Sequence, residues 1–176
     1  VKMIPDFKNE SIKFEHVKSG VVQKTLLTIE GANDGKIIYD PDKNSIDGTD
    51  TSGSLILATE NSNISASKFS SIIGGHDNFI SQSWYSTIIG SAESTITMIA
   101  DPVSQTDLGA GNVILGAQVS NIKLSSIDSN QGVLNTIVGG LFQSITSVDS
   151  TTNDPRYSAV IAGFGNYISH SDASVV

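Results

Sequence analysis

The chain has 176 residues and is acidic, with a net charge of −8 and a pI near 4.6. Its ten basic residues form no stripe, so we expect no nucleic-acid partner, because an acidic surface repels a phosphate backbone. The lack of cysteine excludes disulfides and thiolate metal sites, and no apolar run approaches the roughly 20 residues of a membrane-spanning helix.

The first 52 residues predict a small β cap or joining segment. Residues 11–17 and 25–31 are typical of strands, and Asn-Asp-Gly at 33–35 is a hairpin turn signal between two apolar stretches. The chain starts at Val1 and shows neither a signal peptide nor a membrane anchor, so we expect a piece of a longer protein.

Residues 53–176 form a second region, which consists of repeats. Six blocks of twelve residues align without a gap: 54–65, 70–81, 86–97, 112–123, 135–146 and 158–169. The first position of each block is Ser or Asn, the fifth is Gly or Ala, and the eleventh is Ile. A repeat in fixed register indicates a fold that grows by stacking identical units.

The blocks predict a parallel β-helix or β-roll with a coil of about sixteen residues. β-branched residues precede the Gly, and a second short apolar segment follows, which gives two short strands per coil joined by a tight turn. Three connectors are longer, at 98–111, 124–134 and 147–157, and they start at the same point of the coil. We expect them to form loops on one edge of the rod.

The third and fourth positions of every block are both apolar, as in Ile72 and Ile73. Neighbours in a strand point to opposite faces, so both faces need cover. A thin coil has room for one row inside, and we expect the other row to pack against another chain in a homotrimer. Phe69, Tyr85 and Leu134, each just before a block, are candidates to seal the same seam. The alternative is a monomeric solenoid whose long connectors cover the second row.

Stretches such as "SSIIGGHDNFIS", "STIIGSAEST" and "NTIVGG" resemble repeats of trimeric tail fibres and tailspikes of bacteriophages and large viruses, of the type that carries an intramolecular chaperone. They are similar, more loosely, to the β-roll heads of trimeric autotransporter adhesins. The resemblance implies a homotrimeric, non-enzymatic rod in a virion that attaches to a host glycan or protein receptor. A bacterial adhesin head, on the cell surface, and a glycan-cleaving tailspike stay open as alternatives.

Receptor contact predicts exposed aromatic residues beside polar loops, because flat rings stack on sugars at small entropic cost. The candidates are Trp84, Tyr85, Arg156 and Tyr157. Tyr85 and Tyr157 stand just before a block, as Phe69 does, so a role in the seam between chains explains them equally well.

No catalytic or metal site is expected, and no cofactor. His76 in "GGHDN" is typical of a solvated turn residue, and Asp40, Asp42 and Asn44 lack the Gly spacing and closing Glu of a calcium loop. Glycan cleavage would need two carboxylates within about 10 Å. The acids available on the long connectors are Asp101, Asp107, Asp128, Asp149 and Asp154.

Overall fold

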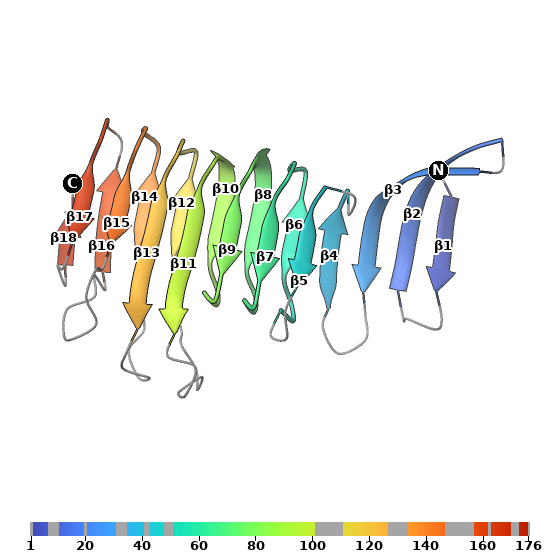
Figure 1. Cartoon of the computed structure of the whole chain (residues 1–176), viewed down its shortest axis with the longest axis horizontal. Coiled ribbons are helices and arrows are strands. Elements are labelled where there is room, and N and C mark those ends of the chain that lie inside the picture. Colours follow the sequence, from blue (N-terminus) through green and yellow to red (C-terminus); the bar gives the residue numbers. More distant parts are fainter. Residues whose placement is uncertain are drawn as a thin grey trace.

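The computed structural model describes residues 2–6, 11–19, 21–30, 35–40, 43–47, 51–100, 111–126, 134–146, 157–161, 163–169 and 173–175. All regular elements in these residues are β-strands, so the predicted all-β class is confirmed. The strands stack along one axis and form a rod (Figure 1).

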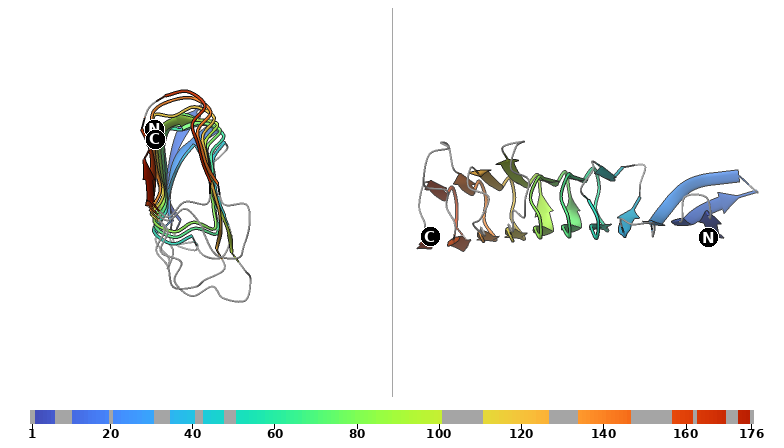
Figure 2. Two further views of the ribbon diagram at one scale, coloured as in Figure 1. Left: turned by 90° about the vertical axis from the view of Figure 1, so that its left-hand side faces the viewer. Right: turned by 90° about the horizontal axis from the view of Figure 1, so that it is seen from below.

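Two sheets run along the rod and face each other when it is seen end-on (Figure 2). The long sheet has eleven strands, in the order β1 (Lys2–Asp6), β2 (Ser11–Lys18), β3 (Val21–Glu30), β4 (Lys36–Tyr39), β6 (Leu55–Leu57), β8 (Ser71–His76), β10 (Thr87–Ala92), β12 (Val113–Leu115), β14 (Thr136–Val138), β16 (Tyr157–Ile161) and β18 (Ala173–Val175). The short sheet has seven, in the order β17 (Tyr167–Ser169), β15 (Ser144–Thr146), β13 (Asn121–Ser126), β11 (Thr95–Ala100), β9 (Phe79–Ser81), β7 (Asn63–Ser65) and β5 (Ser45–Asp47).

From β4 onward both sheets are parallel, and each coil gives one strand to each sheet, as the blocks predict. Ile72 of β8 lies beside Ile56 and Ile88, which are sixteen residues away on either side. Ile80 of β9 lies in the same way between Ile64 and Ile96. The sixteen-residue coil is therefore confirmed for this stretch.

Most of the core consists of two facing rows of aliphatic side chains, to which Leu124 and Ala117 are added. One row comes from the third block position in the long sheet, and the other from the eleventh position in the short sheet. No member is more than 4% exposed: Ile56, Ile72, Ile88, Ile114, Ile137 and Val160 in the first row, and Ile64, Ile80, Ile96, Ile122, Ile145 and Ile168 in the second. The constant Ile of the eleventh position is thus a packing requirement.

The parallel ladder begins inside the segment 1–52. β4 pairs in parallel with β6, and β5 pairs in parallel with β7, so these two strands already belong to a coil of the ladder. Its buried apolar residues among those described, Ile38 and Ile46, are each 7% exposed. Strands β1, β2 and β3 extend the long sheet in antiparallel fashion, and the antiparallel pairing of β3 with β4 confirms the predicted hairpin.

The coil bends where single residues take a left-handed backbone conformation. In the coil that starts at Ser54, these corner residues are Ala58, Asn61, Ala66 and Phe69, with φ between 46° and 53°. Such a φ costs a residue with a side chain about 1 to 2 kcal/mol relative to the right-handed conformation. Gly at the fifth block position avoids this cost, as Gly74 does at φ 69°.

Buried polar side chains join successive coils beside the apolar rows. At the first block position, the backbone N–H of Ser70 donates to Ser54 Oγ (3.3 Å), and the N–H of Ser86 donates to Ser70 Oγ (3.3 Å). The N–H of Asn135 donates in the same way to Asn112 Oδ1 (3.1 Å). Because an unpaired buried amide is costly, this ladder explains the Ser or Asn of the first position.

Candidate functional site

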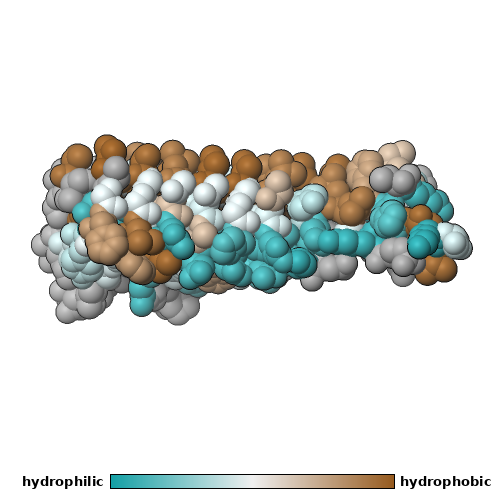
Figure 3. Space-filling view, turned by 90° about the horizontal axis from the view of Figure 1, so that it is seen from above, coloured by the Kyte–Doolittle hydropathy of each residue, from teal (hydrophilic) through white to brown (hydrophobic). Residues whose placement is uncertain are grey.

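An apolar row runs along the outer face of the long sheet. It comes from the fourth block position, which alternates with the buried third position along the same strands. Leu57, Ile89 and Ile161 are 39%, 40% and 57% exposed. Ile73, Leu115 and Val138 continue the row and are half-buried. Figure 3 shows apolar residues as a continuous band along one long edge of the rod.

Aromatic and aliphatic side chains at the corner before three of the blocks add to the apolar surface. Phe69, Tyr85 and Leu134 are 51%, 53% and 54% exposed. The rings of Phe69 and Tyr85 stack with centroids 5.3 Å apart and an interplanar angle of 11°. Tyr157 starts β16 at the equivalent position, but its side chain lies outside the described residues.

The other receptor candidates have different surroundings. Trp84 is half-buried, and the ammonium of Lys68 lies 4.5 Å from the centre of its ring. Tyr85, the next residue, is the more exposed of the two. Arg156 lies outside the described residues. The described structure therefore brings together Trp84, Tyr85, Lys68 and Phe69 around one corner of two successive coils.

The outer face of the short sheet is mainly polar. Ser65, Ser81 and Thr97 stand side by side on β7, β9 and β11. Each follows the buried Ile of its strand and therefore points outward. Lys123 and Thr146 continue this column on β13 and β15. Phe79 on β9, 36% exposed, and Tyr167 on β17, 60% exposed, interrupt this polar surface. The two sheets thus share one core and differ in the chemistry of their outer faces.

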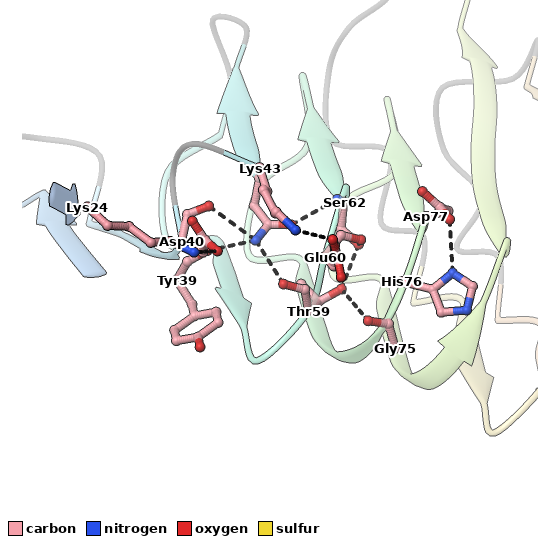
Figure 4. A network of polar contacts seen from close by, with 11 residues as sticks. Lys24, Tyr39, Asp40, Lys43, Thr59, Glu60, Ser62, Gly75, His76 and Asp77 are labelled. Atoms are coloured by element: carbon pink, nitrogen blue, oxygen red, sulfur yellow. Dashed lines mark hydrogen bonds and ion pairs between the residues drawn. The ribbon is translucent and has the colours of Figure 1, made fainter. Parts of the chain in front are cut away.

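A line of charged residues crosses the turns of the first coils (Figure 4). Lys24 forms an ion pair with the buried Asp40, and Lys43 forms one with Glu60. His76 Nδ1 and Asp77 Oδ2 lie 2.9 Å apart, with both side chains about half exposed. Hydrogen bonds from His76 and, to a smaller extent, Asn61 hold the pKa of Asp77 below its ordinary value. This geometry suits a solvated turn.

Asn44 links two coils and leaves little scope for a cation. Its amide nitrogen donates to the carbonyl oxygens of Tyr39 (2.8 Å) and Thr59 (3.0 Å), and its Oδ1 accepts the N–H of Ser62 (2.8 Å). Asp42 lies outside the described residues. Among the residues that the structure describes, no group of three or more His, Asp or Glu could hold a metal ion.

The five carboxylates considered for glycan cleavage lie outside the described residues. The strands that lead into the first two long connectors, β11 and β13, end side by side at Ala100 and Ser126. These connectors therefore start from one edge of the short sheet.

Sequence reasoning missed a group of exposed aromatic residues in the last two coils. Phe142 and Phe164 are 53% and 73% exposed, and their rings meet edge to face with centroids 5.8 Å apart. Tyr167, at the start of β17, is 60% exposed. These residues occupy block positions that are polar in most other coils. The replacement of polar by aromatic residues at these positions was the sequence feature that could have identified the group.

The chain matches no family model, and no curated protein or solved structure matches it either. The described part of the chain contains no helix that is long and apolar enough to cross a membrane.

Proposed function

We propose that this chain is a segment of a homotrimeric viral or bacteriophage tail fibre or spike, which attaches the virion to a host surface without catalysing a reaction. The observation that carries the proposal is the apolar row Leu57, Ile73, Ile89, Leu115, Val138 and Ile161 on the long sheet. Core packing does not account for this row, because the inward row of the same strands already fills the coil.

The shape of this row favours assembly around an axis along the rod. Contiguous exposed apolar surface is typical of interfaces, and here it is a column of Ile, Val and Leu side chains in register on adjacent parallel strands. At about 4.8 Å per coil the row is roughly 30 Å long. Closed rotational symmetry with parallel rods lets every copy bury the same row, and three-fold closure suits a fibre.

The corner residues support the same proposal. Phe69 and Tyr85 have φ of 52° and 56°, which non-glycine residues adopt at a cost, and both rings are about half exposed. Because both rings are half exposed, their burial within one chain offsets little of the free-energy cost of this backbone conformation. A partner chain or a receptor that covers these rings would explain them, and Trp84, Arg156 and Tyr157 are the further candidates for receptor contact.

Light scattering on the purified chain tests the assembly. We expect a molar mass near three times 18.5 kDa for the natural sequence. The double substitution Ile73→Asp with Ile89→Asp should give the single-chain mass, because buried unpaired carboxylates oppose association. The matched control is Ser81→Asp with Thr97→Asp, on the outer face of the short sheet, and it should keep the trimer mass. A monomeric natural chain would overturn the proposal.

A further inference from the structure

The exposed rings of Phe142, Phe164 and Tyr167, here called the aromatic patch, lie on the last two coils of the rod. Phe142 and Phe164 come from the turns that lead from the long sheet to the short sheet, and Leu141 and Phe164 form a bridge between the two coils. Tyr167 follows on β17, where its neighbour in the ladder is Ser144 of β15. The patch therefore faces away from the core.

The backbone conformation of Phe142 indicates that the folding of the coil does not require an aromatic ring at this position, which favours a role in contact with another molecule. Phe142 has φ 59° at the eighth block position, where the first two blocks place Asn61 at 51° and Asp77 at 54° and the next two place Glu93 at 52° and Val119 at 54°. Asn and Asp tolerate this conformation better than a bulky residue. Since Phe142 is 53% exposed, its burial adds little to folding. The coil itself would gain from Asn at this position.

Gly165 occupies the equivalent position in the last coil, and a Cβ built there meets no atom within 4 Å. The last coil thus leaves open space where the earlier coils carry a side chain.

The turns that carry the patch contain no charged residue. Residues 118–121, 141–144 and 164–167 include no Asp, Glu, Lys, Arg or His. The equivalent turns of the first three coils carry Glu60, His76, Asp77 and Glu93. Figure 3 shows this change as hydrophilic residues along the middle of the rod that give way to apolar ones toward one end. These turns therefore offer no charged group to a ligand, whereas the exposed Lys123 lies two residues after Asn121 on β13.

Hydrogen-bonding groups without charge flank the rings. Ser144 lies beside Tyr167, and the exposed Asn121 lies beside Ser144 on the next strand. Gln118, also exposed, precedes Leu141 in the bridge column of the turns. Flat aromatic rings beside amides and hydroxyls match the apolar face and the hydroxyl groups of a sugar. The aliphatic row on the long sheet lacks this combination.

We propose that the aromatic patch binds a neutral carbohydrate, with a pyranose ring stacked on Phe142 or Phe164 and its hydroxyls bonded to Gln118, Asn121 or Ser144. This inference rests on the proposed attachment function, because it names the receptor class and moves the contact from Trp84 and Tyr85 to the last coils.

Saturation-transfer NMR tests the inference with a mixture of the methyl β-glycosides of glucose, galactose and N-acetylglucosamine as the probe. We expect saturation of at least one sugar by the natural chain. Phe142→Asn should weaken its apparent affinity about tenfold, because one aromatic contact is lost and Asn fits the left-handed backbone. Gly165→Asn, which fills the open space, should also weaken it.

The controls separate this site from the alternatives. Asp77→Asn, at the same block position of an earlier coil, should leave binding unchanged. Loss of binding with Tyr85→Asn but not with Phe142→Asn would overturn the inference, as would the absence of saturation for all three sugars.

Light scattering on the same samples distinguishes failure of the inference from failure of the proposed function. A trimer that binds none of the sugars would overturn the carbohydrate site alone. A monomer that binds sugar through Phe142 would overturn the trimeric fibre and keep the site. If Phe142→Asn lowers the molar mass, a second copy of the chain covers the patch and the carbohydrate assignment is wrong.

Discussion

The two sheets of the rod have equivalent inner faces and different outer faces. Inward, each contributes one row of Ile or Val at 0 to 4% exposure. On its outer face, the long sheet carries an aliphatic row that includes Ile73 and Ile89. On the outer face of the short sheet, the same coils carry Ser81 and Thr97. Packing therefore constrains alternate residues only, and the outward residues are free to encode what the rod contacts.

The largest expected effect tests the equivalence of the inner faces. Ile88→Ala in the long sheet and Ile96→Ala in the short sheet should each lower the free energy of unfolding by about 3 kcal/mol, because both side chains are fully buried. Thr97→Ala, which faces outward, should change it by less than about 0.5 kcal/mol. Urea titrations followed by circular dichroism measure all three. If one of the two Ile variants lowered the free energy of unfolding much less than the other, the inner faces would not be equivalent.

A second effect concerns the buried polar residues of the ninth block position, which form a further hydrogen-bonded ladder from coil to coil. Asn78 is 1% exposed, donates to Ser91 O (2.7 Å) and accepts the N–H of Ser94 at Oδ1 (3.1 Å). Asn78→Ala leaves both groups without this partner and should cost about 2 kcal/mol in the free energy of unfolding. Thr95→Ala, on the outer face nearby, is the matched control in the same urea titration. Equal losses in the two variants would contradict a structural role for the ladder.

A smaller, opposite effect is expected at Val119. This residue has φ 54°, which is especially unfavourable for a β-branched side chain, and it is only half-buried. Val119→Asn should raise the free energy of unfolding by about 1 kcal/mol. Glu93→Asn, at the same position of the preceding coil, should give a smaller gain. A lower thermal midpoint for Val119→Asn would show that its packing outweighs the backbone cost.

The smallest effect is a pH dependence at the charged turns. The folded-state pKa of Asp77 lies below its unfolded value because of hydrogen bonds from His76 and Asn61. Its contribution to stability is therefore complete above the unfolded pKa and is lost as the pH falls through the folded pKa. His76→Ala should raise the pKa of Asp77 toward 3.8, as measured by NMR titration of its carboxyl carbon. An unchanged titration would mean that His76 does not stabilise the carboxylate.

The sequence was sufficient to predict the coil and its register, because stacking forces equivalent residues into columns. It also predicted that one of the two adjacent apolar residues in each block lies inside the coil and the other outside. It did not reveal the first coil, since Lys36 stands where the blocks have Ser or Asn and Asp40 where they have Gly or Ala. Ile38 pairs with Ile56, eighteen residues on, so this coil also has a different length. The ladder requires register at the strands and tolerates extra residues at a corner.

The candidate site was harder to predict than the fold. Trp84 and Tyr85 were recognisable as aromatic residues beside a block, but their exposure depends on the corner conformation and on Lys68. Phe142 and Phe164 stand at different block positions, so no column marks them in the sequence. Only the stacking of two coils brings their rings together.

The unbroken register of the Ile columns also means that the length of the rod is set by its number of coils. Each coil adds the same rise of about 4.8 Å and returns the chain to the same point, so insertion or loss of a coil changes the length in fixed steps. The outer faces keep their orientation at every step, because each new coil places its residues in the existing columns. Genetic duplication of one coil can therefore extend the reach of the rod without redesign of its surfaces.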